Sequence, residues 1–399
     1  MSIRRIPWIA KLVLRIFINL DWLAANLHFR RPVLENRVLL VRTDHIGDFV
    51  LWQPAASALV NHYRAQGMRC VLIANAAWAS LPVVTDMFDQ VIPVGIDRMR
   101  QDLRYRLSLI RAFSRLGARV VVNCGLSRDA STSDSLVRAV SAPLKITGIP
   151  EPHTFPRTLG SREDWYDRVI PVASGRTELE MQADLVEAIV GRPPAMRFPA
   201  LALRETSELP EALRGKRFAV IAPGCSSSPL RTWPASAFAR LAERIEEVFG
   251  IDVVLLGSPS ERHSSAEVAR LAGVPVTDLT GLTSLADLTR ILASAAFVVS
   301  NETGTAHLAA ALGTPAITIT GGGHFGRCVP WDHEGHVSNV MIPVSFEMSC
   351  FHCNWSCIHP RGAQDPAPCV RDIKVDAVWS AVLATLQPGS SCASLGKAE

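Results

Sequence analysis

The order of hydrophobic and polar positions divides most of the chain into short apolar runs and longer segments with helical periodicity. The first series of runs, each the length of a buried parallel strand, lies at 37–42, 70–75, 90–94 and 119–124. The second series follows a looser, proline-containing stretch at about 190–216, and lies at 218–222, 252–256, 297–300 and 316–320. Strands that alternate with helices predict an α/β fold of two doubly wound units, whose ligands bind at the carboxyl ends of the strands.

The N-terminal segment 3–31 has the pattern of an amphipathic helix. Its polar side chains fall within an arc of about 100° on a helical wheel, and these are Arg4, Lys11, Arg15, Asn19, Asn26 and Arg30. Lys11 and Arg15 interrupt the apolar region that a signal peptide needs, and the charge-free runs are too short to span a bilayer. The pattern indicates a helix lying in a membrane interface, although a helix packed on the protein's own core fits it as well.

Composition and charge narrow the class of protein. The 399 residues are 48% hydrophobic and 20% charged, which excludes a disordered chain, a disulfide-stapled miniprotein and a collagen-like repeat. The net charge of +4 conceals an asymmetry, because residues 1–119 carry 17 Lys and Arg against 8 Asp and Glu, whereas the remainder has a net charge of −5. The basic front predicts an anionic partner. A phospholipid surface fits this better than nucleic acid, since the sequence has no basic motif interleaved with aromatic residues.

A second basic feature lies in a predicted helix over 99–116. Its arginines recur at steps of four and seven and are expected to share one face: Arg100, Arg104, Arg111 and Arg115. Such a stripe is either a solvated face or a contact with membrane or acceptor phosphates.

The cysteines fall into two groups. Scattered ones, next to apolar runs for the most part, are expected to be reduced core residues: Cys70, Cys124, Cys225 and Cys328. A compact group has the spacing C-x2-C-x3-C-x11-C, at Cys350, Cys353, Cys357 and Cys369. Four thiols at this spacing suit a structural zinc or iron ion, with His352 and His359 as substitute ligands. Two disulfides or four free thiols are the alternatives. The chain has nine cysteines, and this odd number indicates a reducing compartment.

Three polar segments follow predicted strands and therefore lie where a ligand site is expected. In Arg42-Thr43-Asp44-His45-Ile46-Gly47-Asp48, the glycine allows a tight turn and Asp48 begins a helix, where its carboxylate acts as a cap or as a general base. The stretch 223–234 (PGCSSSPLRTWP) offers hydroxyls and amides for a phosphate, with Arg231 as the cation, but it is not a Walker A loop. The stretch 300–315 (SNETGTAHLAAALGTP) opens a helix near Thr303, and Gly321-Gly322-Gly323 then forms a second close-approach loop.

Taken together, these segments resemble glycosyltransferase family 9, the bacterial heptosyltransferases of lipopolysaccharide assembly. The I-G-D turn, the P-G loop before Trp233-Pro234 and a helix start that matches the family's S-N-D-[ST]-G-x-x-H except at Glu302 occur in the family's order, over about 37–385. The resemblance implies a GT-B fold of two Rossmann-like domains facing a central cleft. The domains are then a membrane-surface helix (1–35), an acceptor domain (36–190), a linker (191–215), a nucleotide-sugar domain with the cysteine group (216–387) and a disordered tail (388–399).

The resemblance also implies a chemistry and a set of site residues. The reaction is an inverting transfer of heptose from ADP-L-glycero-D-manno-heptose without a catalytic metal, with Asp48 as the base. The residues that match the donor site are Ser226, Ser227, Arg231, Glu261, Leu282, Glu302, Thr303, Gly304 and His307. Two positions depart from the family, which commonly has Lys at Arg231 and Asp at Glu302. Similar cysteine groups occur in a subset of the family that includes enzymes acting on proteins.

The resulting prediction is a glycosyltransferase that acts on a phosphorylated, lipid-linked saccharide such as the lipopolysaccharide core, at the cytoplasmic face of the bacterial inner membrane. Three alternatives remain open: a Ser or Thr hydroxyl of a protein as the acceptor, another nucleotide sugar as the donor, and a non-catalytic scaffold that binds a nucleotide sugar. The basic front and the amphipathic segment favour the lipid acceptor, and the presence of Asp48 and Arg231 favours an enzyme over a scaffold.

Overall fold

The computed structural model describes residues 8–26, 35–128, 130–151, 162–195, 197–203, 208–225, 228–333 and 335–386. The chain forms two compact units. The first consists of residues up to 45, 54–174 and 180–195, and the second consists of 46–53, 175–179 and the residues from 196 onward. The boundary at 195/196 lies within the stretch predicted as a linker.

The first unit is built on a six-stranded parallel sheet in the order β3-β2-β1-β4-β5-β6. Its strands are β1 (Glu35–Arg42), β2 (Arg69–Asn75), β3 (Gln90–Val94), β4 (Ala118–Asn123), β5 (Leu144–Glu151) and β6 (Arg168–Ala173). Its helices are α1 (Trp8–Asn26), α2 (Ile46–Ala65), α3 (Pro82–Met87), α4 (Ile96–Gln101), α5 (Leu103–Ser114), α6 (Ser133–Ala139) and α7 (Glu178–Val190), with the 3-10 turn η1 (Glu163–Trp165). Helices α2 and α7 begin with residues of the second unit.

The second unit repeats this architecture, with a six-stranded parallel sheet in the order β14-β11-β10-β7-β8-β9. Its strands are β7 (Phe218–Ala222), β8 (Asp252–Leu255), β9 (Val276–Asp278), β10 (Val298–Asn301), β11 (Ala316–Ile319) and β14 (Met341–Val344), with a separate β12–β13 hairpin (Asp332–His333, His336–Val337). Its helices are α8 (Ala235–Phe249), α9 (Arg262–Leu271), α10 (Leu285–Ser294), α11 (Gly304–Ala311), α12 (Pro368–Arg371) and α13 (Val375–Leu386), with 3-10 turns η2 (Glu211–Leu213), η3 (Pro229–Arg231) and η4 (Pro259–Glu261). Each sheet has the crossovers of a doubly wound fold, so the predicted α/β class is confirmed.

Burial explains why the strands were visible in the sequence. All five residues of β7 and the last six of β1 are buried, so these strands appear as continuous apolar runs. Helix α8 instead has one buried face, which includes Phe238, Leu241 and Ile245 and packs on the core of the second unit.

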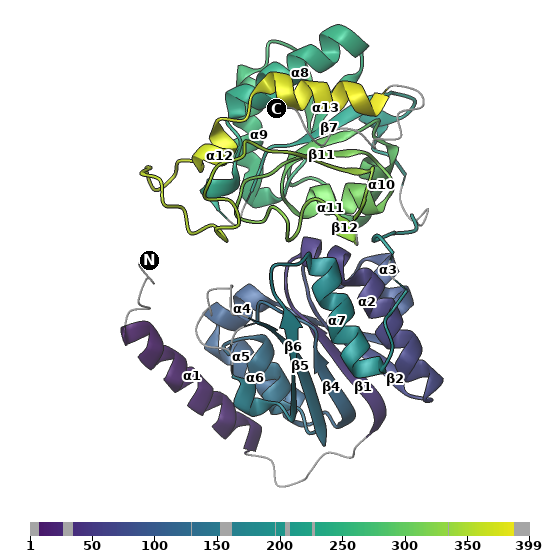
Figure 1. Ribbon diagram of the computed structural model, residues 1–399, viewed down its shortest axis with the longest axis vertical. Helices are drawn as coiled ribbons and strands as arrows, with labels where there is room; N and C mark the ends of the chain where they lie inside the picture. Colours follow the sequence, from purple (N-terminus) through teal and green to yellow (C-terminus); the bar gives the residue numbers. More distant parts are fainter. Residues whose placement is uncertain are drawn as a thin grey trace. The chain divides into compact units, whose positions relative to one another are not determined.

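Helix α1 is an outer layer of the first unit and packs beside α5 and α6 (Figure 1). Its Asp21 is buried and accepts bonds from Arg106 Nε at 2.8 Å and Ser135 Oγ at 2.9 Å. Asp21 lies outside the polar arc predicted for this helix, because it faces the protein. The opposite side exposes about half of Ile16, Trp22 and Leu23. None of the helices in the described ranges is long and apolar enough to cross a membrane.

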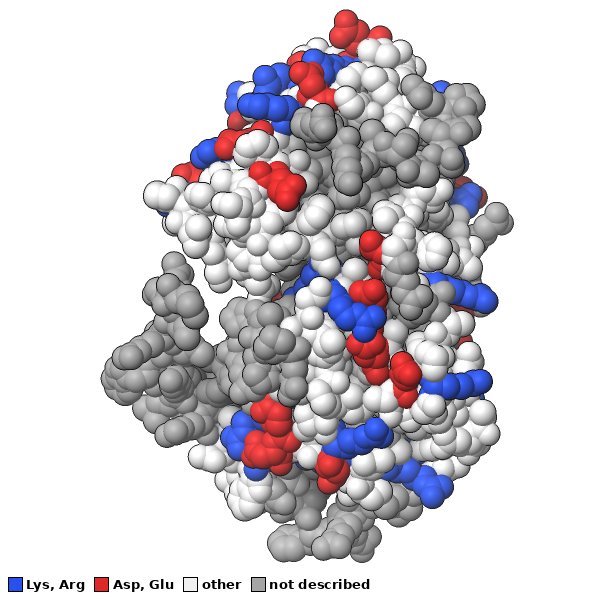
Figure 2. Space-filling view, in the orientation of Figure 1, with Lys and Arg blue, Asp and Glu red and all other residues white. Residues whose placement is uncertain are grey.

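The predicted helix 99–116 is wrong, because the chain forms two helices that break at Asp102. The carboxylate of Asp102 accepts a hydrogen bond from the amide of Tyr105 at 3.0 Å and so caps the N-terminus of α5. Asp is a common N-cap residue because its short side chain reaches the free amides of the first helical turn. Arg100 therefore belongs to α4, with Nη1 3.8 Å from Asp97 Oδ1. The face shared by the remaining arginines is that of α5 and its C-cap, at Arg104, Arg111 and Arg115, and all are exposed. On the face shown in Figure 2, acidic and basic side chains are interspersed.

Candidate functional site

Two glycines bring the first turn of α2 against the first turn of α11. A β-carbon on Gly304 would lie 2.2 Å from Cγ2 of Ile46, and one on Gly47 would lie 3.0 Å from Cδ2 of His307. Neither position therefore accepts a larger residue without movement of its neighbour. The contact places Asp48, in the first turn of α2, within the second unit, at the carboxyl end of β10. Helix starts carry partial positive charge, so the meeting of two favours negative charge there.

An ion pair that the sequence did not reveal lies near Asp48. Arg327 donates from Nη2 to Glu178 Oε2 at 3.1 Å, and the amide of Glu178 donates to the carbonyl oxygen of Arg327 at 2.7 Å. Burial alone would lower the pKa of Arg327, but the negative charges of Glu178 and Asp48 raise it above its usual value. Arg327 therefore stays a cation and offsets the two carboxylates. Burial raises the pKa of the adjacent Cys328 thiol far above its usual range, so that thiol is neutral.

Glu302, at the end of β10, is the centre of a buried charged cluster. Its Oε2 accepts a bond from Arg231 Nη2 at 2.7 Å and lies 2.8 Å from Nδ1 of His324, and its carbonyl oxygen also accepts from Arg231. Burial would raise the pKa of Glu302, but the charges of Arg231 and His324 and the bonds to His307 and His324 hold it well below its usual value. The Glu302 carboxylate therefore stays ionised and is turned toward two basic side chains.

His307 is held in one tautomer. Its Nδ1 lies 3.1 Å from Nε1 of Trp331, and an indole N–H can only donate, so Nδ1 is the acceptor. The proton of the neutral ring is then on Nε2, which lies 3.9 Å from Glu302 Oε1. Both rings are buried. Trp331 is a site residue that no sequence motif indicated, because it comes from the loop between β11 and β12.

The remaining donor-site predictions within the described residues follow three strands of the second sheet, β8, β9 and β10. Thr303 is the N-cap residue of α11 without a side-chain capping bond, and Gly304 is the first residue of that helix. Glu261 accepts bonds at Oε2 from the amide (2.7 Å) and hydroxyl (2.8 Å) of Ser258, and a β-carbon on Gly224 would lie 2.6 Å from it. Leu282 is 68% exposed. Ser226 and Ser227 lie outside the described residues.

The cysteine group comes together in one region of the second unit. Cys369 is buried, and the other three are half-buried. Burial raises the pKa of Cys353 and Cys369, and the neighbouring thiols of the group raise both further. Cys350 Sγ lies 3.5 Å from Nε2 of His359, a substitute ligand predicted from the sequence.

In the described part of the chain, the set of ligand-type atoms that lies within 4.8 Å of one another is not the cysteine group but that of Glu302, His324 and Cys328. Arg231 binds the same Glu302 oxygen, Oε2, and the Cys328 thiol is neutral, so this set is poorly suited to a cation.

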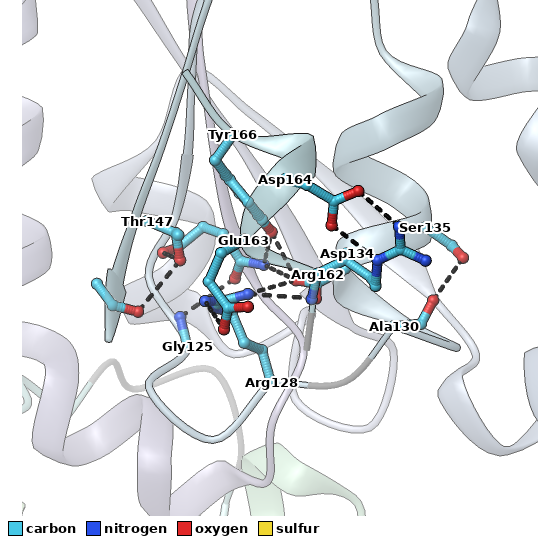
Figure 3. A network of polar contacts seen from close by, with 12 residues as sticks. Gly125, Arg128, Ala130, Asp134, Ser135, Thr147, Arg162, Glu163, Asp164 and Tyr166 are labelled. Atoms are coloured by element: carbon cyan, nitrogen blue, oxygen red, sulfur yellow. Dashed lines mark hydrogen bonds and ion pairs between the residues drawn. The ribbon is translucent and has the colours of Figure 1, made fainter. Parts of the chain in front are cut away.

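The first unit holds its own buried polar network at the carboxyl end of β4 (Figure 3). Asp134 accepts bonds from Tyr166 Oη at 2.6 Å, from Arg128 Nη1 at 3.1 Å and from Asn123 Nδ2 at 3.3 Å. Burial raises the pKa of Asp134, against the lowering effects of Arg128 and Tyr166. The network joins the carboxyl end of β4 and the loop after it to Tyr166, just before β6. Asn123 and Tyr166 in this network are 43 positions apart in the chain, so no local sequence motif predicted the network.

Comparison with known proteins gives a consistent match. Residues 133–353 match the family model described as glycosyltransferase family 9 (heptosyltransferase). Lipopolysaccharide heptosyltransferase 1 of Pseudomonas aeruginosa is 28% identical over 293 residues, which are 71% of this chain and 78% of that protein.

Solved structures match along most of the chain. The Escherichia coli heptosyltransferase WaaC with ADP-2-deoxy-2-fluoro heptose matches with a TM-score of 0.59 and 21% identity, covering 87% of this chain and 99% of that one. The iron-containing dodecameric heptosyltransferase TibC with ADP-D-beta-D-heptose matches with a TM-score of 0.53 and 14% identity, covering 88% and 76%. These likenesses confirm the predicted GT-B type of α/β fold.

Proposed function

Since this chain belongs to glycosyltransferase family 9, we propose that it transfers a heptose from ADP-L-glycero-D-manno-heptose, with inversion, to the lipopolysaccharide core or a related lipid-linked saccharide. The observation that carries the proposal is the seating of the Asp48 turn against the start of α11, in the unit that also holds Arg231 and Glu302. A carboxylate and a buried, fixed cation at the carboxyl ends of the strands are the two groups that such a transfer needs.

Asp48 acts as the general base of the proposed reaction. Its carboxylate accepts the proton of the acceptor hydroxyl while that oxygen attacks the anomeric carbon from the face opposite the ADP. The new C–O bond forms as the bond to the diphosphate oxygen breaks, and the electron pair leaves with ADP. Arg327 lies near enough to interact with the Asp48 charge, and its own bonds to Glu178 fix its place.

The leaving diphosphate is stabilised by Arg231, assisted by the start of α11. Arg231 remains cationic, because its neighbour Glu302 raises its pKa against the effect of burial. Preorganised charge of this kind stabilises a developing anion without reorganisation during the reaction. This proposal needs no catalytic metal, because the protein supplies the cation. In this proposal the Glu302 carboxylate binds Arg231 and His324 and does not face the phosphates, which explains why a carboxylate lies beside a phosphate site.

The ADP moiety is proposed to lie along the ends of β7 and β8. Glu261, between Gly224 and the end of β8, is placed to accept bonds from ribose hydroxyls, as acidic residues do after the second strand of doubly wound folds. Leu282 offers an exposed apolar surface for the adenine.

The membrane part of the proposal rests on α1. The buried Asp21–Arg106 pair ties the helix to the first unit, and the exposed apolar side chains of Ile16, Trp22 and Leu23 point away from it. A helix so anchored, with exposed arginines on neighbouring α5, suits the surface of an anionic bilayer. We therefore propose a peripheral location on the cytoplasmic face of the inner membrane.

The cysteine group is proposed to hold one structural zinc or iron ion. Thiolates are the ligands that both metals accept in tetrahedral sites, and the neighbouring thiols of the group add to the effect of burial on the pKa of Cys353 and Cys369, which supports a common site. Bound metal would fix the fold of the segment and would take no part in the transfer. Elemental analysis of the purified chain is expected to give about one ion per chain, and Cys369→Ser is expected to lose it. Cys225→Ser, a half-buried thiol outside the group, is the matched control.

The acceptor is tested by offering both classes to the same enzyme. Purified protein, ADP-heptose and excess EDTA are incubated with a heptose-free lipopolysaccharide core or with a Ser- and Thr-rich protein domain, and products are weighed by mass spectrometry. One added heptose on the core, with inverted anomeric configuration by NMR, is the expected result. Transfer only to the protein would move the acceptor to protein hydroxyls, and no transfer to either would favour the non-catalytic scaffold.

A further inference from the structure

The cysteine-containing segment 350–357 is seated directly on the glycine loop that follows β11. A β-carbon on Gly322 would lie 2.3 Å from Phe351, and one on Gly323 would lie 2.3 Å from Trp355. The amide of His352 donates to the carbonyl oxygen of Gly322 at 2.7 Å. The three successive glycines are therefore required so that this segment can approach the backbone at the end of β11.

This seating brings the Trp355 ring to the charged cluster around Glu302. The guanidinium carbon of Arg231 lies 5.7 Å from the centre of the Trp355 ring, and the His324 ring lies 5.6 Å from it in an edge-to-face arrangement. Trp355 therefore contacts Arg231 and His324, the two basic side chains that bind Glu302 Oε2. Within the described residues the indole N–H is buried without a hydrogen-bond partner, so packing of the ring holds it in place.

The backbone of the segment has an unusual conformation that its surroundings must maintain. His352, Asn354 and Trp355 have φ values of 66°, 46° and 58°, in the left-handed region that bulky residues rarely adopt. Such conformations persist where the neighbouring structure determines them. Here the Trp355 ring is placed by its close contact with Gly323.

We propose that Trp355 is a positioning residue for Arg231, and that its ring holds the guanidinium in the orientation that binds the donor diphosphate. Glu302 fixes one edge of the guanidinium through Nη2. The indole face restrains the plane of the group and favours its charge, because the face of an aromatic ring attracts a cation. The inference rests on the proposed function of Arg231 as the donor-diphosphate cation.

The test is the affinity for ADP, measured by calorimetry on the full chain. Trp355→Leu removes the ring and is expected to weaken ADP binding on the order of 10-fold, as for a desolvated cation–ring contact. Trp355→Phe keeps an aromatic face and is expected to stay within about 3-fold of the unmutated chain. The matched control is Trp379→Leu, because Trp379 is also half-buried in the second unit but packs on Phe249.

A double-mutant cycle shows whether Trp355 acts through Arg231. In an Arg231→Gln background, Trp355→Leu is expected to change ADP affinity less than about 2-fold further, because no cation is left to position. Equal losses for the Phe and Leu variants, an equal loss for Trp379→Leu, or a full additional loss in the Arg231→Gln background would each overturn the role. If the unmutated chain failed to bind ADP at all, the donor assignment of Arg231 would fall, and this role with it.

Discussion

Arg231 and Glu302 form a buried ion pair, with Nη2 of the arginine 2.7 Å from Oε2 of the glutamate. The two residues are 71 positions apart and meet because η3 follows β7 and Glu302 follows the neighbouring strand β10. His324 shares the same carboxylate oxygen. The pair therefore joins two of the segments that the sequence marked as parts of one site.

This pair predicts a pH dependence of stability. The pKa of Glu302 is held well below its ordinary value of 4.5, so its contribution to the free energy of unfolding is fully present above pH 4.5 and is lost as the pH falls through the lower folded-state value. Glu302→Gln is expected to be less stable than the unmutated chain at pH 7, by about 3–5 kcal/mol for a broken buried pair.

Urea unfolding at pH values from 3 to 7 measures this effect. The difference between Glu302→Gln and the unmutated chain is expected to shrink below pH 4.5. Glu267→Gln is the control, because Glu267 pairs with Arg270 on an exposed helix face. A constant difference across the whole range would show that the Glu302 charge contributes nothing to folding.

Asp48→Asn tests the general base. The amide keeps the size of the side chain but cannot accept the proton, so kcat is expected to fall 10²–10⁴-fold. ADP affinity is expected to stay within about 2-fold. Asp97→Asn is a matched control, since Asp97 is also in the first turn of a helix but is exposed. Transfer by Asp48→Asn at the rate of the unmutated chain would contradict the assignment.

Gly304→Ala tests the contact between the two helix starts. The new methyl group would lie 2.2 Å from Cγ2 of Ile46, and overpacking of this kind costs about 1–3 kcal/mol. The thermal midpoint and kcat are both expected to fall, and a second change, Ile46→Ala, is expected to restore part of both by removing Cγ2. Gly95→Ala is the control, because its β-carbon would meet nothing closer than 3.5 Å. An unaltered kcat in Gly304→Ala would show that the close contact does not place Asp48.

Vesicle sedimentation tests the surface proposed for α1. Trp22→Ala combined with Leu23→Ala removes two exposed apolar side chains without touching the buried Asp21, so folding is expected to be unchanged. Binding to vesicles with anionic lipid is expected to fall at least 10-fold, because each buried side chain contributes about 1.5–3 kcal/mol. Val248→Ala, an exposed apolar position on α8, is the control. Equal binding by the double variant and the unmutated chain would exclude this face of α1 as the membrane contact.

The sequence predicted four strands of each sheet, and complete burial made the signal clearest in strands such as β7. The five-residue run 218–222 is β7 to the residue, and the helix predicted to open near Thr303 is α11, with Thr303 as its N-cap. The break at Asp102 was not predicted, because a single Asp within a helical pattern is compatible with either a cap or an exposed helix position.

The site was predicted only where its residues are close in the chain. The partners of the motif residues come from distant loops, as with Trp331 on His307 and Trp355 on Arg231, and no local pattern links them. Arg327 and Glu178 are 149 positions apart and pair only because the fold brings the start of α7 to the loop after β11. No sequence pattern indicated the role of Asp21 for the same reason, since its partner Arg106 lies 85 positions away.

The most direct test of the central proposal is a calorimetric titration of the chain with ADP-heptose, and with UDP- and GDP-linked sugars in parallel. Metal is chelated and Mg2+ is left out, so that the cation at the diphosphate comes from the protein alone. The proposal predicts selective binding of ADP-heptose under these conditions, lost on the order of 10-fold or more in Arg231→Gln. Preference for another nucleotide sugar, or no binding to any of them, would contradict heptose transfer from ADP-heptose.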